Sequence, residues 1–281
     1  MVKAEKKGSD FEILLSTMNR TSLSFLQDMF PKDDFKNYSI LIINQTSKDK
    51  QLKSDSPNVR VINSFEKGLS KSRNLAIKNG EGTICLIADD DVKYKTHFKK
   101  IILEAFKKHH KADILTFQIV NKKGELYNKF PNIIKHNKNT VSTVNSVAIA
   151  LKRKKIIENN SFFNENFGLG SAFETADEYV FLRSALRKGL KLFFEPKVIL
   201  MHPNYSSGRA VANDKIIYAR SAVFYKYNGL ITYLKLGWHL FLLIKNKELK
   251  SAHFFKKYQQ GLKGINDYKS LLKQGIESRK S

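Results

Sequence analysis

The stretch that decides the fold is ICLIADDD, residues 84–91, in which five apolar residues lead directly into three consecutive carboxylates. The apolar run has the length and composition of a buried strand. Asp89, Asp90 and Asp91 repel one another at such a strand end. Two explanations are open. A hard divalent cation can offset the repulsion, or the residues can form a solvated turn that opens a helix near Thr96, with Asp91 as its cap.

The segments before this strand alternate between strand-like and helix-like patterns. Short β-rich runs occur at 11–17, 38–46 and 58–64, and helical spacing occurs at 22–30 and 68–80. Strands separated by helices predict right-handed crossovers and a mainly parallel sheet. In such sheets, ligands bind at the carboxyl ends of the strands, where the acidic triplet stands.

The segments after the triplet extend the same pattern. Helices are predicted at 97–111 and 176–189, and strands at 113–120, 141–153 and 191–203. Gly189 suits the C-terminal end of the second helix, because glycine adopts the backbone conformation that ends many helices.

Composition limits the classes of protein that fit. A hydrophobic content of 42% in 281 residues argues against a disordered chain. Cys85 is the single cysteine, which excludes an internal disulfide framework and fits a reducing compartment. The N-terminus carries only a short apolar run, which predicts a first strand and no secretory signal. The formal net charge of +24 indicates anionic partners: nucleic acid, anionic lipid or phosphate-bearing substrates.

The order of polar motifs at the predicted strand ends resembles the nucleotide-binding half of family 2 glycosyltransferases with the GT-A fold. In that pattern, a strand ends near Thr and Asn-Arg, and a second ends in acidic residues and Ser. A Gly-x-x-x-x-Arg-Asn segment follows, and a DxD motif comes last. The matching residues are Thr17, Asn19 and Arg20; Asn44, Gln45 and Ser47; Gly68, Arg73 and Asn74; and Asp89 to Asp91. Several matches in one order are more specific than a lone DxD motif, so the metal explanation of the triplet leads.

The resemblance implies a role for each of these residues. Asp91 would coordinate Mn²⁺ or Mg²⁺ at the diphosphate of a nucleotide-sugar. Asp89 would face the ribose or donor sugar near the metal, and Asp90 would support them. Arg73 would contact the diphosphate or nucleotide, which suits a guanidinium; the alternative is a solvated helix charge. Thr17, Asn19 and Arg20 would complete the donor site.

One departure from the family concerns the base. The family usually has Asp-Asp where this chain has Asn44 and Gln45. An amide side chain can accept a hydrogen bond from the uracil N–H and donate one to a flanking carbonyl, so a UDP-sugar remains the expected donor. The alternative is that both amides satisfy the turn after the strand.

The segment FGLGSAFETADEYVFLRSALRKGLKLFFEPKVILMHP, residues 167–203, resembles the acceptor side of the same family. There a Gly-rich loop precedes an acidic pair that opens a helix. Counting back eleven residues from Gly189 gives Glu178 as the expected general base. Asp177 is the runner-up and Glu174 a weaker candidate. An inverting transfer needs such a base to take the acceptor hydroxyl proton. The alternative is that the pair only stabilises a helix N-terminus.

The end of this segment carries a further candidate ligand. His202 follows a predicted strand at the position where a histidine often completes the metal site in the family; the alternative is a packed or surface histidine. The stretch NYSSGR, residues 204–209, suits a loop over the diphosphate, in which Arg209 would contact phosphate.

The last part of the chain has a different composition. Residues 209–281 carry 15 Lys and Arg against 4 Asp and Glu. The most apolar window, 229–244, contains Lys235 and has 16 residues, whereas a bilayer span needs about 20 apolar residues. A basic, aromatic, amphipathic segment of this kind can lie on an anionic membrane surface. The alternative is a helical extension that packs on the catalytic domain.

The predicted fold class is therefore α/β, with a GT-A (Rossmann-like) mixed, mainly parallel sheet flanked by helices and a C-terminal helical extension. The GT-A catalytic domain is expected at 1–208, with a nucleotide-binding half at about 1–95 and an acceptor half at about 96–208. The basic helical segment at 209–281 follows.

The predicted function is metal-dependent inverting transfer of a sugar from a nucleotide-sugar donor to a hydroxyl of a glycan, expected to be lipid-linked. The context implied is bacterial capsule, O-antigen or exopolysaccharide synthesis in the cytoplasm, with peripheral attachment to the inner face of the plasma membrane. Two other classes remain. One is a basic nucleic-acid-binding protein, although no recognition motif is present and nucleic acid is not the expected partner. The other is a nucleotidyltransferase, whose usual Gly-rich loop is missing from residues 16–25.

Overall fold

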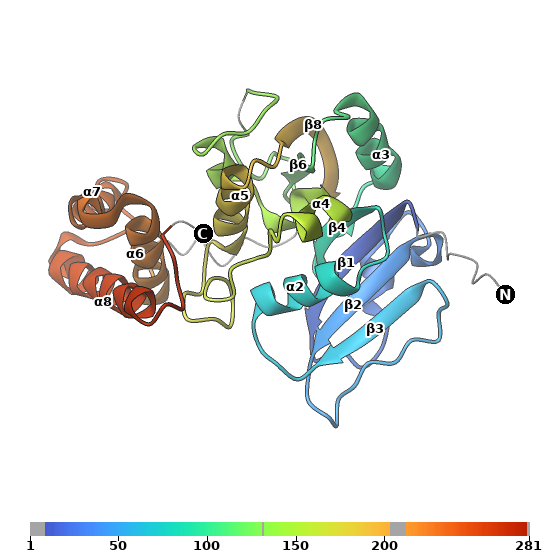
Figure 1. The fold of residues 1–281 in the computed structure, drawn as a ribbon, viewed down its shortest axis with the longest axis horizontal. Coiled ribbons are helices and arrows are strands. Elements are labelled where there is room, and N and C mark those ends of the chain that lie inside the picture. Colours follow the sequence, from blue (N-terminus) through green and yellow to red (C-terminus); the bar gives the residue numbers. More distant parts are fainter. Residues whose placement is uncertain (1–8, 131, 203–211, 280–281) are drawn as a thin grey trace.

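A computed structural model of the chain describes residues 9–130, 132–202 and 212–279. Eight strands form one sheet in the order β3-β2-β1-β4-β7-β6-β8-β5 (Figure 1). The strands are β1 (Phe11–Met18), β2 (Ser39–Gln45), β3 (Val59–Ser64), β4 (Ile84–Asp89), β5 (Lys93–Tyr94), β6 (Ile114–Val120), β7 (Ile149–Lys152) and β8 (Leu192–Met201). The predicted mixed, mainly parallel sheet is confirmed, as is the helical character of the C-terminal segment.

The N-terminal half of the sheet is wholly parallel. β1 pairs with β2 and β4, and β2 pairs with β3, all in parallel. In this register Thr17 lies opposite Asn44, and Ser16 lies opposite Asp89. The carboxyl ends of these strands therefore meet at one edge, and most of the polar residues predicted for a donor site gather there.

Helices cover both faces of the sheet (Figure 1). Along β1, Ile13 and Leu15 pack in the core that includes α3, while Leu14 packs in the core that includes α2, α4 and α5. This alternation follows from the two-residue period of a strand. The α-helices of the described residues are α1 (Phe25–Met29), α2 (Leu69–Asn79), α3 (Phe98–Lys108), α4 (Arg153–Glu158), α5 (Asp177–Arg187), α6 (Asp214–Asn228), α7 (Thr232–Lys245) and α8 (Phe254–Lys273).

Three local predictions need correction. Of the strand predicted at 141–153, only β7 forms, because two 3₁₀ turns (Thr140–Thr143 and Ser146–Ala148) precede it. Asn145 caps the second turn by accepting a hydrogen bond from the Val147 N–H at 3.2 Å, and such local bonds compete with strand pairing. The helix at 22–30 is reduced to α1. Asp91 does not cap α3, which begins after His97 with no side-chain cap.

The C-terminal helices pack on the rest of the chain. Ala219 and Val223 of α6 and Tyr268 of α8 lie in one core with Phe167 and Phe173, which flank the Gly-rich loop before α5. In Figure 1 these helices form a group beside α5, on the side away from β1 to β3. The alternative that the tail packs on the catalytic domain is therefore correct for α6 and α8.

Close packing between α6 and α8 depends on glycine. A Cβ added at Gly264 would lie 2.1 Å from the backbone oxygen of Tyr218, and one at Gly261 would lie 2.5 Å from Leu236. A second link is buried: Lys226 donates to Glu277 at 3.0 Å. The C-terminal segment is thus fixed by close backbone contact and a buried ion pair.

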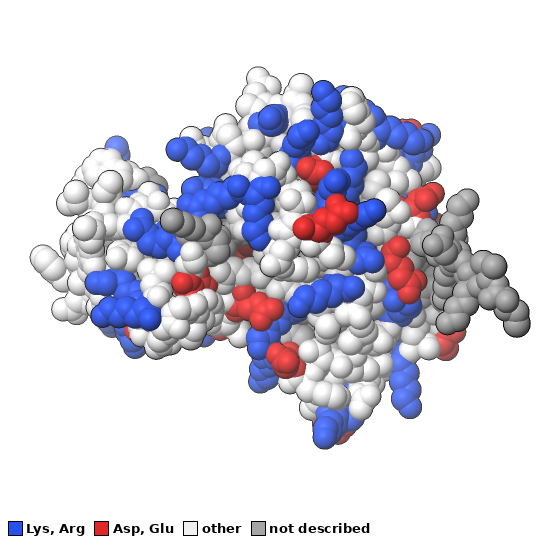
Figure 2. All heavy atoms as spheres, viewed as in Figure 1, with Lys and Arg blue, Asp and Glu red and all other residues white. Residues whose placement is uncertain are grey.

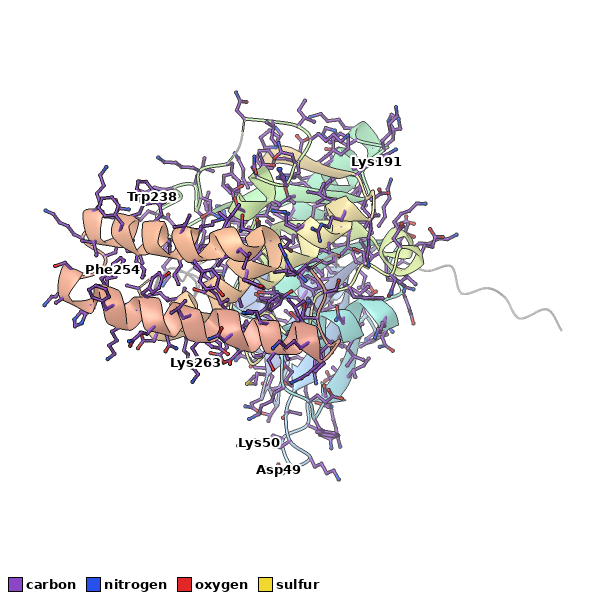
Figure 3. The ribbon with its side chains drawn as sticks, turned by 60° about the vertical axis from the view of Figure 1, so that its left-hand side comes forward. Asp49, Lys50, Lys191, Trp238, Phe254 and Lys263 are labelled. Atoms are coloured by element: carbon purple, nitrogen blue, oxygen red, sulfur yellow. The ribbon has the colours of Figure 1, made fainter. Side chains whose placement is uncertain are left out.

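Helix α7 has a different surface. Leu234, Trp238 and Phe241 are 79%, 62% and 50% exposed, and recur along one face of the helix. Figure 3 shows Trp238 on α7 and Phe254 at the start of α8, both near the end of the molecule that lies farthest from the sheet. None of the helices within the described ranges combines the length and apolar content needed to cross a membrane.

Positive charge is spread over the whole molecule. Figure 2 shows Lys and Arg side chains scattered over one face, with Asp and Glu side chains in smaller number among them. The excess of basic residues is therefore not confined to the C-terminal helices.

Candidate active site

Asp90 joins the carboxyl ends of β1 and β4. The Thr17 hydroxyl donates to Asp90 Oδ2, and Arg20 Nε donates to the same oxygen at 2.8 Å. Asp90 is thus engaged by the chain itself, which fits the supporting role implied for it.

The two amide side chains at the end of β2, Asn44 and Gln45, make different hydrogen bonds. Asn44 is fully buried, accepts from the Arg20 N–H at 3.1 Å, and donates to the Arg20 carbonyl and to Asn63 at 3.0 and 2.9 Å. These bonds occupy both ends of the amide, so the structure supports the alternative of turn satisfaction for Asn44. Gln45 accepts from the Gly68 N–H at 2.8 Å. It also lines a cavity, and its predicted contact with the base stays a prediction.

Arg73 lies at the centre of a buried network. Its side chain is 1% exposed. Nη1 donates to Asp177, while Nη2 donates to the two carboxylate oxygens of Asp89 at 2.9 and 3.1 Å and to Ser146 at 2.9 Å. Arg73 is therefore not a solvated helix charge. It bridges the triplet to the helix of the predicted base, and its contact with a diphosphate stays a prediction.

Asp91 and His202 face each other at the opening of the same site. His202 Nε2 lies 3.7 Å from Asp91 Oδ1, too long for a hydrogen bond but within the span of two ligands bound to one ion. Burial raises the pKa of Asp91, as do Asp89 and Asp90, and His202 opposes them. His202 Nδ1 is buried with no hydrogen-bond partner among the described residues.

These features fit a bound divalent cation only in part. The described residues contain no group of three or more His, Cys, Asp or Glu side chains arranged around one ion position. Asp91 and His202 would supply two ligands to such an ion, and Asp89 is held by Arg73. Mg²⁺ and similar ions commonly take one or two protein carboxylates and complete their shell with substrate phosphates and water. The residues present therefore suit an ion that binds together with a diphosphate.

The acidic pair opens α5 in a strained turn. Ala176, which precedes it, has φ 62° and ψ 23°, a left-handed conformation that costs a non-glycine residue about 1 kcal/mol. Gly168 allows the preceding loop to approach, because a Cβ there would lie 3.0 Å from the Asp177 Cβ. The turn holds Asp177 on Arg73 and leaves Glu178 facing a cavity.

Glu178 has the electrostatic environment of a base. It is partly buried, and this burial, together with the negative charge of Asp177, raises the pKa of Glu178 to about 8. A catalytic base works best when its pKa lies near the working pH. Glu174, the weaker candidate, is paired with Lys215 at 3.0 Å.

Two cavities meet at Glu178. The first, here called the carboxylate cavity, has a volume of about 440 Å³. The second, here called the helix cavity, has a volume of about 750 Å³ and lies between α5, α6 and α7. Glu178, Asn145, Thr175 and Ala176 belong to the walls of both.

Most of the predicted site residues are brought together by the fold. Those that line the carboxylate cavity are Thr17, Gln45, Arg73, Asp89, Asp90, Asp91, Asp177, Glu178 and His202. Asn19, Arg20 and Asn44 are not part of this lining. Asn19 instead forms the turn after β1, with φ 56° and its N–H bonded to the Gln45 carbonyl at 2.9 Å. The predicted phosphate loop at 204–209, with Arg209, lies outside the described residues.

Sequence reasoning missed the walls of the helix cavity. Arg183, Arg220 and Lys235 resemble ordinary solvated charges of amphipathic helices, and His239 lies in an apolar run. Ser146 lies within the strand predicted at 141–153, so its hydrogen bond with Arg73 was not expected. No local signal distinguishes these residues, because only the packing of α5, α6 and α7 places them around one cavity.

A carboxylate-rich edge of a parallel sheet, next to a second cavity that shares one candidate base, is the arrangement expected of a glycosyltransferase with the GT-A fold. The family model described as Glycosyl transferase family 2 matches residues 15–173, and the chain belongs to this family. No curated protein matches the sequence.

The chain is also similar to solved structures of TarS from S. aureus. The structure of TarS 1–349 with UDP has 15% identity and a TM-score of 0.55, over 95% of this chain and 92% of that one. The same fragment with UDP-GlcNAc has 15% identity and a TM-score of 0.53, with the same coverage. A longer TarS structure has 13% identity and a TM-score of 0.54, over 96% of this chain and 50% of that one. At this identity the likeness concerns the fold.

Proposed function

We propose that this glycosyltransferase moves a sugar from a UDP-sugar to a hydroxyl of a glycan in bacterial polysaccharide synthesis, with inversion at the anomeric carbon. The observation that carries the proposal is the position of Glu178, whose carboxylate stands between the two cavities. A donor in the carboxylate cavity and an acceptor in the helix cavity would meet at this residue. Because the chain belongs to the family 2 glycosyltransferases, we do not propose the nucleic-acid-binding or nucleotidyltransferase function.

The carboxylate cavity is the proposed donor site. In this proposal Gln45, at the end of β2, would contact the base, and Asp89 would contact the ribose or sugar. Arg73 holds Asp89 in position and lines the cavity beside it. The complexes of TarS with UDP and UDP-GlcNAc support a uridine nucleotide as the donor in this fold.

Asp91 and His202, with Asp89 as the third predicted ligand, would hold Mn²⁺ or Mg²⁺. When bound, the ion supplies positive charge that stabilises the leaving diphosphate. The proposed reaction at the protein's own residues is a single displacement. The acceptor oxygen forms a bond to the anomeric carbon, the bond from that carbon to the diphosphate oxygen breaks, and the hydroxyl proton passes to Glu178.

Calorimetry and rate measurements test the donor and base assignments separately. Wild type should bind UDP more tightly with Mn²⁺ than without, and Asp91→Ala should lose the Mn²⁺ effect. Glu178→Gln should bind UDP like wild type while transfer falls by about 10²- to 10⁴-fold. Glu104→Gln, on exposed α3, is the matched control and should retain both properties. Absence of UDP binding in wild type, or full transfer by Glu178→Gln, would contradict the proposal.

The exposed face of α7 supports peripheral attachment to a membrane, and hence a lipid-linked acceptor. Leu234 and Trp238 would enter the lipid interface, and lysines near them would attract anionic head groups, each by about 1 kcal/mol. Leu234→Glu and Trp238→Glu should reduce sedimentation with anionic phospholipid vesicles. Phe65→Glu, at a 55% exposed position directly after β3, is the control. Equal sedimentation of all variants would exclude attachment through α7.

A further inference from the structure

The wall of the helix cavity has a strong excess of positive charge. Four of the residues that line it are Lys or Arg, one is His, and Glu178 is the single carboxylate among the described lining residues. The basic residues come from separate segments of the chain: Lys138, Arg183, Arg220, Lys235 and His239. A second set of cations is therefore gathered on the acceptor side of Glu178, away from the triplet.

These cations are held close enough to disfavour one another's charge. Burial lowers the pKa of Lys235, and Arg183 adds to this effect. Burial also lowers the pKa of His239 to about 4, with further contributions from Arg220 and Lys235. Like charges in a partly buried wall are costly without a compensating anion. Glu248 favours the charge of Arg220, so the arrangement offers an entering anion chiefly the charges of Arg183 and Lys235.

Aromatic rings hold the cationic groups in fixed orientations. The Arg183 guanidinium lies 4.2 Å from the Tyr227 ring centre and donates to the Tyr179 hydroxyl at 2.7 Å. Lys235 Nζ lies 4.7 Å above the Phe224 ring. Because these contacts already restrict the long side chains, less conformational entropy is lost when a ligand binds. The cations are thus positioned before any ligand arrives.

His239 provides an independent sign of a missing partner. Its ring packs edge-on against Phe224 at 5.6 Å. Its Nε2 atom is buried and has no hydrogen-bond partner within the described part of the chain. Buried polar atoms are rarely left unpaired in proteins, so this nitrogen is available to a group that enters the cavity.

We propose that the helix cavity binds a phosphate group of the acceptor, so that the substrate is a glycan carrying a phosphodiester or diphosphate. Arg183, Arg220 and Lys235 bind the phosphate and so place the acceptor hydroxyl at Glu178. Guanidinium groups suit the oxygens of phosphate, and the charges of Arg183 and Lys235 exceed what Glu178 alone would balance. This inference rests on the proposed function, because it assigns the donor diphosphate to the carboxylate cavity.

The first test measures binding without requiring the acceptor to be known. Pyrophosphate is titrated into the protein in the presence of saturating UDP, which fills the carboxylate cavity. Arg183→Gln and Lys235→Gln should each weaken pyrophosphate binding about tenfold, as expected for loss of a charged hydrogen bond. Lys263→Gln, on α8 (Figure 3) and outside the lining of the helix cavity, should bind like wild type. Equal pyrophosphate affinity in all four proteins, or no binding, would overturn the inference.

The second test separates the two sources of phosphate. The acceptors are an oligosaccharide 1-phosphate, the same oligosaccharide on a polyprenyl diphosphate, its neutral form, and a uronic acid analogue. Arg183→Gln and Lys235→Gln should raise the acceptor KM about tenfold for both phosphorylated forms, and leave the donor KM and the neutral form unchanged. A preference for the polyprenyl form identifies a lipid source, and equal use identifies a soluble phosphoglycan.

The two proposals can fail separately. If the uronic acid analogue is preferred, or if the variants leave the KM of the phosphorylated acceptors unchanged, the phosphate site is wrong. In that case UDP binding and the need for Glu178 still support the proposed function. If UDP does not bind, the proposed function fails, and pyrophosphate binding by the Arg183 and Lys235 variants still tests the anion site.

Discussion

The pH dependence of transfer should follow the ionisation of Glu178, whose pKa is raised to about 8 by burial and by the charge of Asp177. A general base must be ionised before it can accept a proton. With this pKa, about a tenth of the molecules carry an ionised Glu178 at pH 7, and about nine tenths do at pH 9. kcat/KM for the donor, which reports ionisations of the enzyme form that the donor binds, should therefore rise about tenfold between these pH values.

Asp177→Asn tests the cause of this pKa. The substitution removes the negative charge beside Glu178, and leaves Arg73 with one carboxylate partner fewer. Both changes favour the ionised form of Glu178, so the midpoint should move to lower pH. Two unit charges at about 5 Å in an effective dielectric of about 20 interact by about 3 kcal/mol, which sets an upper limit of about two pH units. We expect about one unit, since solvent screens part of the interaction.

The assay is the initial rate of UDP release at limiting donor and saturating acceptor, measured from pH 6 to pH 10. Circular dichroism establishes that Asp177→Asn remains folded over this range. The midpoint is the relevant quantity, because a displaced Arg73 could lower the plateau rate without changing the titration of Glu178. A midpoint that stays fixed or rises would refute the electrostatic reasoning. Loss of transfer at every pH in Asp177→Asn, with transfer retained in Glu178→Gln, would move the base to Asp177.

Three further predictions concern stability. Arg73→Met leaves the carboxylates of Asp89 and Asp177 without their buried partner. It should lower the free energy of unfolding by about 3–5 kcal/mol, measured by urea denaturation. Gly264→Ala should cost about 1–3 kcal/mol because the new methyl group meets the Tyr218 carbonyl oxygen. Gly237→Ala is its control: the nearest atom lies 3.9 Å away, so this helical position should be unchanged or stabilised. Because the folded state raises the pKa of Glu178, it binds a proton more tightly than the unfolded chain, and stability should fall as pH rises from about 4.5 to about 8. The melting temperature of Glu178→Gln should fall less over this range than that of wild type.

The parallel half of the sheet was predictable because its signals are local. Each of its strands is a short apolar run, and the polar residues that follow β1, β2 and β4 had to meet once the strands were parallel. Residues 141–153 show the limit of the same reasoning. Their β-branched residues favour a strand, but Asn145 forms a competing local hydrogen bond, and this depends on tertiary surroundings.

The contacts that organise the site join residues that are distant in the sequence. Arg73 and Asp177 are separated by 104 positions, and no periodic pattern in either segment indicates that they form an ion pair. The sequence therefore indicated residues that gather at one edge of the sheet, but not the contacts between them. Arg73 is not a surface charge but a buried link between the triplet and α5, and its contact with a diphosphate stays a prediction.

The C-terminal helices show why two sequence-based alternatives were not exclusive. Residues 209–281 were expected either to bind a membrane or to pack on the catalytic domain. α6 and α8 pack, through Gly264 and the core around Tyr268, while α7 leaves Leu234 and Trp238 exposed. Helices α6 and α7 also form one wall of the helix cavity, which Glu178 lines as well. Deleting the segment would therefore remove part of the proposed acceptor site together with any membrane contact, and only point substitutions on α7 can separate the two.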